Sequence, residues 1–433
     1  MISGRCRGAT DLTDINDMND SPEQGLTVYL VGGAVRDGLL GRPVKERDWV
    51  VVGSDPEEML RRGFTLVGQD FPVFLHPRTH EEYALARTER KTGHGYRGFS
   101  VHADPGVRLE DDLLRRDLTI NAMAQAPDGR IIDPYGGRED LEARRLRHVS
   151  AAFTEDPVRI LRTARFAARY RPWNFEIAPE TLERMRSMVD GGEVDHLAPE
   201  RVWQETHKAL GEDHPGRYFR VLRDCGALAR WFPEVDALFG VPQPERWHPE
   251  IDTGVHVLIA LDQAARLSPD PLTRFAVLVH DLGKGLTPKE KLPHHPGHEA
   301  AGVPLVDRLC ERLKAPAAYR DLGRLTARHH LHVHRVDELK AKTLVDCFSK
   351  LDLWHRPERL TPFLQACEAD ARGRTGFEEH PYPQAVRFRQ AFEAARVVKS
   401  DDLLEQGIEG PALGVALRRQ RIRAVEQFKR QSS

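Results

Sequence analysis

Cysteine is scarce in this sequence and is not arranged for cross-linking. Among 433 residues there are five cysteines, an odd number, and no two of them form a CxxC pair. Scattered cysteines argue against a disulfide framework and against a zinc knuckle, and they are typical of a protein from a reducing cytoplasm. The five are Cys6, Cys225, Cys310, Cys347 and Cys367.

Long hydrophobic runs are also missing. No apolar run approaches the roughly 20 residues that a membrane-spanning helix needs, and the polar segment 1–25 lacks the apolar core of a secretory signal. We interpret that segment as a disordered extension, with Met18 as a candidate start of the native chain. The composition, with 40% hydrophobic and 30% charged residues, is that of a soluble globular protein.

Neither sign of charge dominates the sequence. The 64 basic and 66 acidic residues give a formal net charge of −2. A nucleic-acid-binding protein often carries a basic excess, so this balance argues against a large nonspecific footprint. A local basic groove is still compatible with these numbers, and composition alone therefore does not decide whether the protein binds RNA.

The chain is long enough for several domains, and its patterns divide it into an α+β part and an all-helical remainder. Short apolar runs such as TVYLV, DWVVVG and EEYALARTE alternate with turn residues and predict a small sheet. Further on, RYFRVLRDCGALARWF places apolar residues on one helical face, and Gly226 is suited to end that helix. We predict a disordered extension (1–25), a sheet-containing head (26–147), a helical neck and body (148–245), a histidine-rich domain (246–354) and a helical tail (355–433).

A pair of glycines marks the first candidate site. Gly32 and Gly33 end the first predicted strand and open a short predicted helix over residues 34–40. Glycine lets a backbone approach a phosphate closely, and the N–H groups at a helix start attract anions. Arg36, one turn into the helix, is placed to reach the same anion. A plain tight turn explains the glycine pair equally well.

Two acidic residues, Glu46 and Asp48, precede the most apolar predicted strand. Because residues two apart on a strand point to the same side, both carboxylates are expected on one surface at the edge of the strand. Phosphoryl-type transfer uses divalent metals to neutralise a triphosphate and activate a hydroxyl, and Mg²⁺ prefers such oxygen ligands. By itself, the pattern is also that of an exposed charged turn.

Four motifs occur in an order that resembles the class II tRNA nucleotidyltransferases. They are YLVGGAVRD, RDWVVVG, RRDLTINA and EDPVRILRTARFAARY, and the resemblance extends from about Val28 to at least Gly376. That family belongs to the polymerase-β-like superfamily and also includes bacterial poly(A) polymerases. The segments DFPVFLHPRTHEEYALARTERK and CGALARWFPEVDALFGVP are similar to its CCA-adding branch, which carries an HD domain. The resemblance implies a polymerase-β-like head and the addition of CCA to tRNA 3′ ends from CTP and ATP.

The resemblance assigns nucleotide-binding roles in the head. Gly33 and Arg36 match positions that bind the triphosphate, and Arg116 in RRDLTINA matches an arginine that contacts the nucleotide. Asp117 and Asn121 are expected to order the turn around Arg116.

The resemblance also assigns the catalytic carboxylates. Glu46 and Asp48 match the pair that binds Mg²⁺. The family usually has Asp at the first position, and Glu is one methylene longer, so this departure bears on rate and metal preference. Glu82, on a predicted strand, is either a third carboxylate or a solvated charge.

Base selection is implied for Asp156 and Arg159, which match the pair that these enzymes use as a protein template. A carboxylate accepts from an exocyclic amine, and a guanidinium donates to ring or carbonyl acceptors. CTP and ATP carry an amine on the pairing edge of the base, whereas UTP and GTP carry a carbonyl at that position. Standing three apart, the two residues are expected to be neighbours on a helix. The family pattern also assigns Arg162 and Arg165 to nucleotide binding. The assignment of Arg165 is the weaker one, because a row of residues three apart winds around a helix. The alternative is an arginine-rich helix face that contacts only solvent.

A second constellation lies in the histidine-rich domain. His256 occurs in GVHVLIAL, and His280 and Asp281 end the apolar run RFAVLVHDLGKG. Imidazole and carboxylate are ligands of borderline divalent metals. The ordered set resembles the HD phosphohydrolase superfamily, which implies metal-dependent phosphatase, 2′-nucleotidase and 2′,3′-cyclic phosphodiesterase activity, with Ni²⁺ or Mg²⁺.

The ligand set of this second site is incomplete in the sequence. HD enzymes usually have a further Asp ligand downstream, and the sequence does not place it. His298, His329 and His330 compete as helpers. A degenerate, non-catalytic HD domain is the alternative.

The partners implied are tRNA, CTP and ATP, with no membrane and no protein partner, and a monomer or homodimer. Candidate phosphate contacts are the arginines after Gly191 and the C-terminal run RRQRIRAVEQFKR, which is otherwise a solvated basic helix. A poly(A) polymerase, and a non-catalytic RNA- or nucleotide-binding protein with a degenerate head, remain the alternatives.

Overall fold

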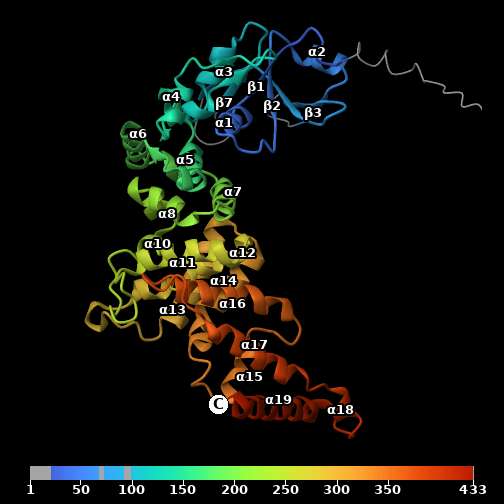
Figure 1. Cartoon of the computed structure of the whole chain (residues 1–433), viewed down its shortest axis with the longest axis vertical. Coiled ribbons are helices and arrows are strands. Elements are labelled where there is room, and N and C mark those ends of the chain that lie inside the picture. Colours follow the sequence, from blue (N-terminus) through green and yellow to red (C-terminus); the bar gives the residue numbers. More distant parts are fainter. Residues whose placement is uncertain (1–20, 68–72, 92–98, 433) are drawn as a thin grey trace, which may run out of the picture. The chain divides into compact units, whose positions relative to one another are not determined.

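The computed structural model describes residues 21–67, 73–91 and 99–432 (Figure 1). The chain forms two compact units, one ending at Asp156 and the other beginning at Pro157. Most of the predicted disordered extension lies outside the described residues. None of the described helices is both long enough and apolar enough to cross a membrane.

The first unit is built on a mixed sheet with the strand order β3-β4-β5-β2-β1-β8-β9. Only β2 and β5 run parallel, and the other neighbouring strands are antiparallel. The strands of this sheet are β1 (Thr27–Val31), β2 (Asp48–Val52), β3 (Thr65–Val67), β4 (Val73–Leu75), β5 (Glu82–Leu85), β8 (Ala124–Gln125) and β9 (Ile131–Ile132).

Hydrophobic side chains cover both faces of this sheet, as the central strand β2 shows. Successive side chains of a strand point to opposite faces, and Val50 and Val51 join two different hydrophobic clusters, so both faces of the sheet are covered. The run EEYALARTE is not one strand as predicted, because it divides between β5 and the ribbon of β6 (Thr88–Lys91) and β7 (Phe99–His102). The helices of this unit are α1 (Gly33–Leu39), α2 (Pro56–Arg61), α3 (Leu109–Leu114), η2 (Thr119–Asn121), α4 (Gly137–Glu142) and η3 (Ala151–Glu155).

The second unit begins with helices that pack through apolar faces. In α8, the predicted apolar face is buried, and Gly226 adopts φ 81° after it, as a helix-ending glycine does. Proline occupies the first turn of several of these helices, where its missing N–H costs no hydrogen bond. The helices are α5 (Val158–Arg169), α6 (Pro179–Asp190), α7 (Pro199–Leu210), α8 (Pro215–Asp224), α9 (Ala227–Trp231) and α10 (Pro233–Asp236).

A helical bundle follows, and it reaches beyond the predicted boundary at residue 354. Asp252 and Asp270 cap the first two helices through their carboxylates. Helix α16 packs against α11, α12 and α14, so it completes the bundle although it lies in the segment assigned to the tail. The bundle consists of α11 (Thr253–Leu267), α12 (Pro271–Val279), α13 (His298–Leu313), α14 (Ala317–His334) and α16 (Leu360–Arg372).

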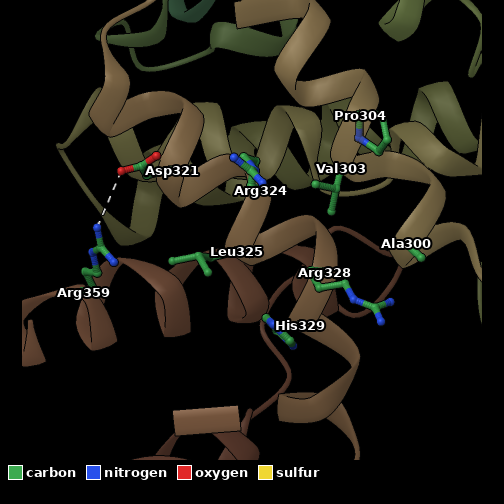
Figure 2. A pocket seen from close by; sticks show the side chains of 9 residues that line it. All are labelled: Ala300, Val303, Pro304, Asp321, Arg324, Leu325, Arg328, His329 and Arg359. Atoms are coloured by element: carbon green, nitrogen blue, oxygen red, sulfur yellow. Dashed lines mark ion pairs between the residues drawn. The ribbon is translucent and has the colours of Figure 1, made fainter. Parts of the chain in front are cut away.

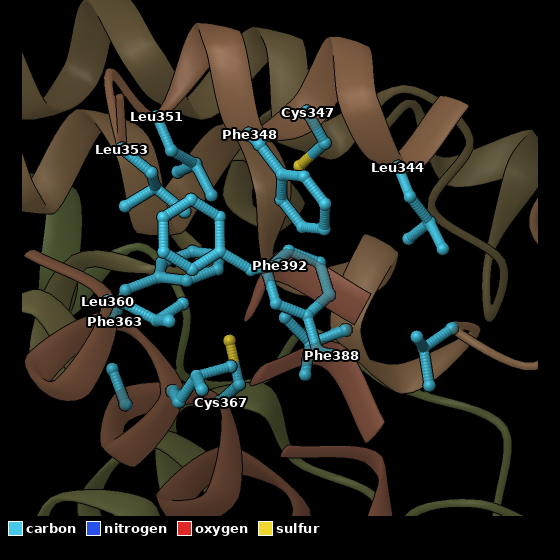
Figure 3. Packing of buried hydrophobic residues seen from close by; sticks show 14 of the residues in the cluster. Leu344, Cys347, Phe348, Leu351, Leu353, Leu360, Phe363, Cys367, Phe388 and Phe392 are labelled. Atoms are coloured by element: carbon cyan, nitrogen blue, oxygen red, sulfur yellow. The ribbon is translucent and has the colours of Figure 1, made fainter. Parts of the chain in front are cut away.

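The remaining helices form an aromatic core against this bundle (Figure 3). The ring of Phe348 lies edge-on to Phe388, with centroids 5.1 Å apart. The basic C-terminal run forms α19, in which the Arg421 guanidinium lies 3.8 Å from the Trp354 ring centroid and Arg418 pairs with Asp346. These cations therefore stabilise the fold itself. The helices are α15 (Ala341–Lys350), α17 (Pro383–Arg396), α18 (Asp401–Leu404) and α19 (Gly410–Ser432).

Gly373, at the end of α16, allows α11 and α16 to approach each other. A Cβ there would lie 2.6 Å from the Cα of Ala260 in α11. We expect Gly373→Ala to destabilise the protein by roughly 1–3 kcal/mol, because backbone rather than a side-chain tip would have to move. Thermal unfolding measures this, with Gly414→Ala, which meets nothing within 4 Å, as the control. Equal melting temperatures for the two variants would contradict the close approach.

Candidate functional site

The glycine pair lies against two arginines in the first unit. Gly32 has φ 66° and ψ −123°, and a Cβ at this position would lie 2.9 Å from Nη1 of Arg116. Arg36 is 3% exposed and donates hydrogen bonds to the side chains of Asn121 and Asp37. Because Gly32 has no Cβ, the Arg116 guanidinium can lie close to its backbone. A plain tight turn would not need this close contact.

Asp112, which was not predicted as a site residue, fixes the arginine pair of RRDLTINA. Its buried carboxylate accepts from Arg115 at 2.7 Å and from Arg116 at 3.2 Å. Burial alone would raise the pKa of Asp112, but the two guanidiniums bring it below its ordinary value. The signal was present, because the acid stands three and four residues before the arginines on a helical pattern.

The turn after Arg116 is ordered as predicted. Asn121 donates from Nδ2 to Oδ1 of Asp117 at 2.9 Å, and the same oxygen accepts the backbone N–H of Leu118 at 2.8 Å. Arg116 also donates to the backbone oxygen of Asn121 at 3.4 Å. Three residues of one motif thus hold each other in place.

The acidic residues meet at the start of β2, but not by the geometry we predicted. Asp48 is the first residue of β2, and Glu46 lies in the preceding loop, so strand alternation does not relate the two. Burial raises the pKa of Asp48; Arg116 opposes the rise and Glu46 adds to it. Asp48 is also in register with Glu82 on the parallel strand β5. Three carboxylates and one arginine are therefore gathered where the central strands β2 and β5 begin.

The predicted helical pairing of Asp156 and Arg159 is wrong. Helix α5 begins at Val158, and Asp156 precedes it with φ −126° and ψ 108°. The physical reason is Pro157, since the residue before a proline is pushed away from helical dihedrals. Arg159 lies in the first turn of α5 and is 8% exposed.

Arg165 has a partner inside the second unit. Its Nε donates to Oε2 of Glu205 in α7 at 2.8 Å, and both side chains are 8% exposed. Burial would raise the pKa of Glu205, but Arg165 first and then Arg162 lower it. Arg165 therefore fixes α5 to α7, which favours a positioning role over direct nucleotide contact, while Arg162 is only partly buried.

The second constellation assembles in the bundle, together with a fourth residue. His256 comes from α11, and His280 and Asp281 come from the end of α12. Nε2 of His256 lies 3.0 Å from Oδ1 of Asp370 in α16, and Nε2 of His280 lies 3.5 Å from the same oxygen. Asp370 supplies the downstream carboxylate that the sequence did not place, because it lies past the predicted end of the domain.

The rings around this centre are oriented by backbone carbonyls. Nδ1 of His280 donates to Val277 at 2.7 Å, Nδ1 of His298 to His295 at 2.8 Å, and Nδ1 of His330 to Thr326 at 3.0 Å. Since a carbonyl only accepts, the neutral rings carry their proton on Nδ1 and expose an Nε2 lone pair. This is the arrangement by which proteins prepare histidines for a metal.

Unsatisfied polar atoms show where a cation fits. Nε2 of His280, Oδ1 of Asp281 and Nε2 of His298 are buried and make no hydrogen bond. Asp281 belongs to two ligand groups, one with His256 and His280 and one with His298 and His330. Of the three competing histidines, His298 and His330 therefore join Asp281.

Protonated side chains neutralise the buried carboxylates of this centre. Burial would lower the pKa of His280, but Asp281 and Asp370 raise it to about 10. Burial would likewise raise the pKa of Asp281, which His280 and then Lys284 hold well below its ordinary value. The Lys284 ammonium lies 2.6 Å from Oδ2 of Asp281. Protons and a lysine therefore balance two buried carboxylates that a divalent metal would otherwise balance.

His329 faces away from this centre. It lines a cavity of about 610 Å³ over α13 and α14, together with Arg324, Arg328 and Arg359 (Figure 2). Burial lowers the pKa of His329 to about 3, with further lowering by His332 and nearby cations. None of the histidines and carboxylates of the bundle centre lines this cavity.

Family comparisons agree with this architecture. The chain matches the Poly A polymerase head domain over residues 28–147, a probable RNA- and SrmB-binding site of polymerase A over 174–239, and the HD domain over 253–354. A nucleotidyltransferase head with an acidic strand edge is thus joined to helices that contain an HD centre.

Curated relatives define the family more closely. The chain is 64% identical over 405 residues to the multifunctional CCA protein of Methylococcus capsulatus, covering 93% of this chain and 95% of the relative. It is 62% identical over 405 residues to that of Alkalilimnicola ehrlichii, covering 94% and 98%. The chain belongs to the family of multifunctional CCA proteins.

Solved structures share the fold. The CCA-adding enzyme of Bacillus stearothermophilus in complex with CTP has a TM-score of 0.58 at 23% identity, covering 95% of this chain and 92% of that one. The Thermotoga maritima CCA-adding enzyme complexed with tRNA has a TM-score of 0.60 at 18% identity, covering 98% and 97%.

Replacement of Gly32 tests the arginine cradle. In Gly32→Ala the new methyl group meets Arg116, and the backbone conformation is one that only glycine adopts easily. We expect a loss of roughly 1–3 kcal/mol of unfolding free energy, measured by denaturant titration. Gly38→Ala in the same short helix meets nothing within 4 Å and should be neutral or slightly stabilising. A Gly32→Ala protein as stable as Gly38→Ala would show that neither the backbone conformation nor the contact with Arg116 requires glycine at this position.

Proposed function

We propose that this protein adds and repairs the CCA end of tRNA, using CTP and ATP, by metal-dependent nucleotidyl transfer at the start of β2. The observation that carries this proposal is the gathering of Glu46, Asp48 and Glu82 beside Arg116 where the central strands β2 and β5 begin. Family membership supports it, since the curated relatives are multifunctional CCA proteins. The activity requires tRNA and nucleoside triphosphates, and we therefore place it in the cytoplasm.

The carboxylates fit a divalent metal, for which we propose Mg²⁺. Asp48 and Glu46 are close enough that Glu46 raises the pKa of Asp48, and oxygen ligands of this kind are the ones that Mg²⁺ prefers. When bound, the metal neutralises the triphosphate and lowers the pKa of the attacking 3′ hydroxyl. Asp48, Glu46 and Glu82 hold it at the strand edge.

The remaining groups bind and orient the substrates. Gly33, Arg36 and Arg116 form the cradle for the triphosphate and hold the departing pyrophosphate. Asn121 and Asp112 keep the two guanidiniums in place.

Base choice is assigned to four residues of the EDPVR segment and helix α5. We propose that Asp156 accepts from the exocyclic amine of CTP or ATP and that Arg159 and Arg162 donate to ring acceptors. Arg165 acts through its ion pair with Glu205, which fixes the helix that carries the other arginines.

Asp48→Ala tests the nucleotidyl-transfer site. We expect incorporation of CMP and AMP into tRNA lacking CCA to fall by about 10³-fold or more, because several kcal/mol of charge stabilisation are removed. Glu46→Asp, which restores the residue usual in the family, should keep substantial activity. Labelled CTP also separates this function from that of a poly(A) polymerase, which would leave CTP unused. An Asp48→Ala enzyme with wild-type incorporation would remove the assignment.

The bundle centre supports a second activity. We propose that His256, His280, Asp281 and Asp370 bind one divalent metal, Ni²⁺ or Mg²⁺, and hydrolyse phosphate esters and 2′,3′-cyclic phosphates. The bound metal supplies a water of lowered pKa as nucleophile. His298 and His330 lie on the other side of Asp281, and the buried Lys284 ammonium holds Oδ2 of Asp281 in place.

Asp370→Ala tests this second site, with Asp402→Ala, at an exposed position of α18, as the control. We expect phosphate release from 2′-AMP or a 2′,3′-cyclic nucleotide to fall by about 10²-fold or more, while CCA addition is kept. The control should keep both activities. Retention of hydrolysis in Asp370→Ala, or its absence in the wild type with added Ni²⁺ and Mg²⁺, would refute the proposal.

A further inference from the structure

The four histidines of the HHLHVH segment in α14 divide between two faces of the helix. His330 and His334, four residues apart, face the HD centre: their Nε2 atoms lie 3.8 Å from Asp281 and 2.8 Å from Asp370. His329 and His332, three residues apart, form the other pair, with ring centroids 5.2 Å apart. Of these four histidines, the proposed activities use only His330.

The second pair meets a cysteine of the neighbouring helix α15. The ligand atoms of His329, His332 and Cys347 all lie within 4.8 Å of one another. Cys347 is 2% exposed, and Figure 3 shows it at the aromatic core. His329 is 5% exposed, and its Nδ1 is buried without a hydrogen bond. Leaving such an atom unpaired costs free energy, so its position points to a ligand.

We propose that His329, His332 and Cys347 form a second metal site, separate from the HD centre and selective for a borderline cation such as Zn²⁺, Co²⁺ or Ni²⁺. Two imidazoles and a thiolate form a donor set for such ions, whereas Mg²⁺ and Ca²⁺ prefer oxygen ligands. Binding forms a metal–sulfur bond, and the thiol proton leaves to solvent, with no change in oxidation state. Water completes the coordination beside the partly exposed His332.

Surrounding charges set the strength of this site. Arg328 and Lys350 lie close enough to His329 to act on its charge. They oppose a divalent cation. Burial also raises the pKa of the Cys347 thiol to about 12, with a smaller lowering by Lys350, so forming the thiolate that binds metal costs further free energy. We therefore expect weaker binding than at a closed zinc site with four protein ligands.

The site would connect two helices with different tasks. Helix α14 carries His330 and His334 toward the HD centre, and α15 belongs to the aromatic core. A metal between His329 and Cys347 would fix α14 to α15 and so hold the first pair of histidines in place. It would act as a positioning site, without touching a substrate.

Titration of the full-length protein with Co²⁺ tests the proposal, because a thiolate bound to Co²⁺ gives a near-ultraviolet charge-transfer band. None of the ligands proposed for the HD centre is a cysteine, so that centre gives no such band. We expect the band in the wild type and in Cys310→Ser, which replaces an equally buried cysteine of α13 outside the cluster. It should vanish in Cys347→Ser and weaken in His332→Gln. It should persist in Asp281→Ala, which damages the HD centre alone.

Several results would overturn the proposal. They are no charge-transfer band in the folded wild type, a band that survives Cys347→Ser, or a band that is lost in Asp281→Ala. Circular dichroism checks that each variant is folded. If Cys347→Ser does not fold, His332→Gln decides the question, because a partly exposed side chain tolerates replacement, and an undiminished band there would also refute the site. None of these readouts depends on CCA addition or on phosphate hydrolysis.

Discussion

A buried carboxylate must be neutralised by a neighbouring cation, and this constraint organises both units. Asp112 is fully buried and holds Arg115 and Arg116. Removing one partner of such a buried pair typically costs about 3–5 kcal/mol, because the other charge is left uncompensated. The position of the arginine beside Gly32 thus follows from a carboxylate that touches no substrate.

The same constraint gives a different result in the bundle. Asp281 and Asp370 are buried among histidines and one lysine, and the rings donate their Nδ1 protons away from the centre. The carboxylates are therefore balanced by protonated groups, which release a proton to solvent when a metal binds. The permanent charges of guanidiniums neutralise the buried carboxylate in the head, whereas imidazoles that can change protonation state neutralise those in the bundle.

The sequence predicted those elements whose cause is local. The apolar run of β2 and the glycine that follows it predict a buried strand and its end, and both are present. The predicted pairing of Asp156 with Arg159 on one helix failed because spacing was used without the restriction that Pro157 imposes. Asp112 was visible in the helical spacing, but its importance depends on burial, which the sequence does not report directly.

Asp370 illustrates a limit of a different kind. It reaches His256 and His280 only because α16 packs across α11 and α12, and that contact depends on tertiary structure and on the small Gly373. A histidine on a helix has no assigned face until its neighbours are known, which is why His298, His329 and His330 were equivalent in sequence. Once α14 is placed, the choice follows from helix geometry: residues four apart join the HD centre, and the pair three apart turns toward Cys347. Packing thus decides which residues of separate helices come together as candidate metal ligands. The glycine turn and the acidic residues at the start of β2 can instead be recognised from neighbouring residues in the sequence.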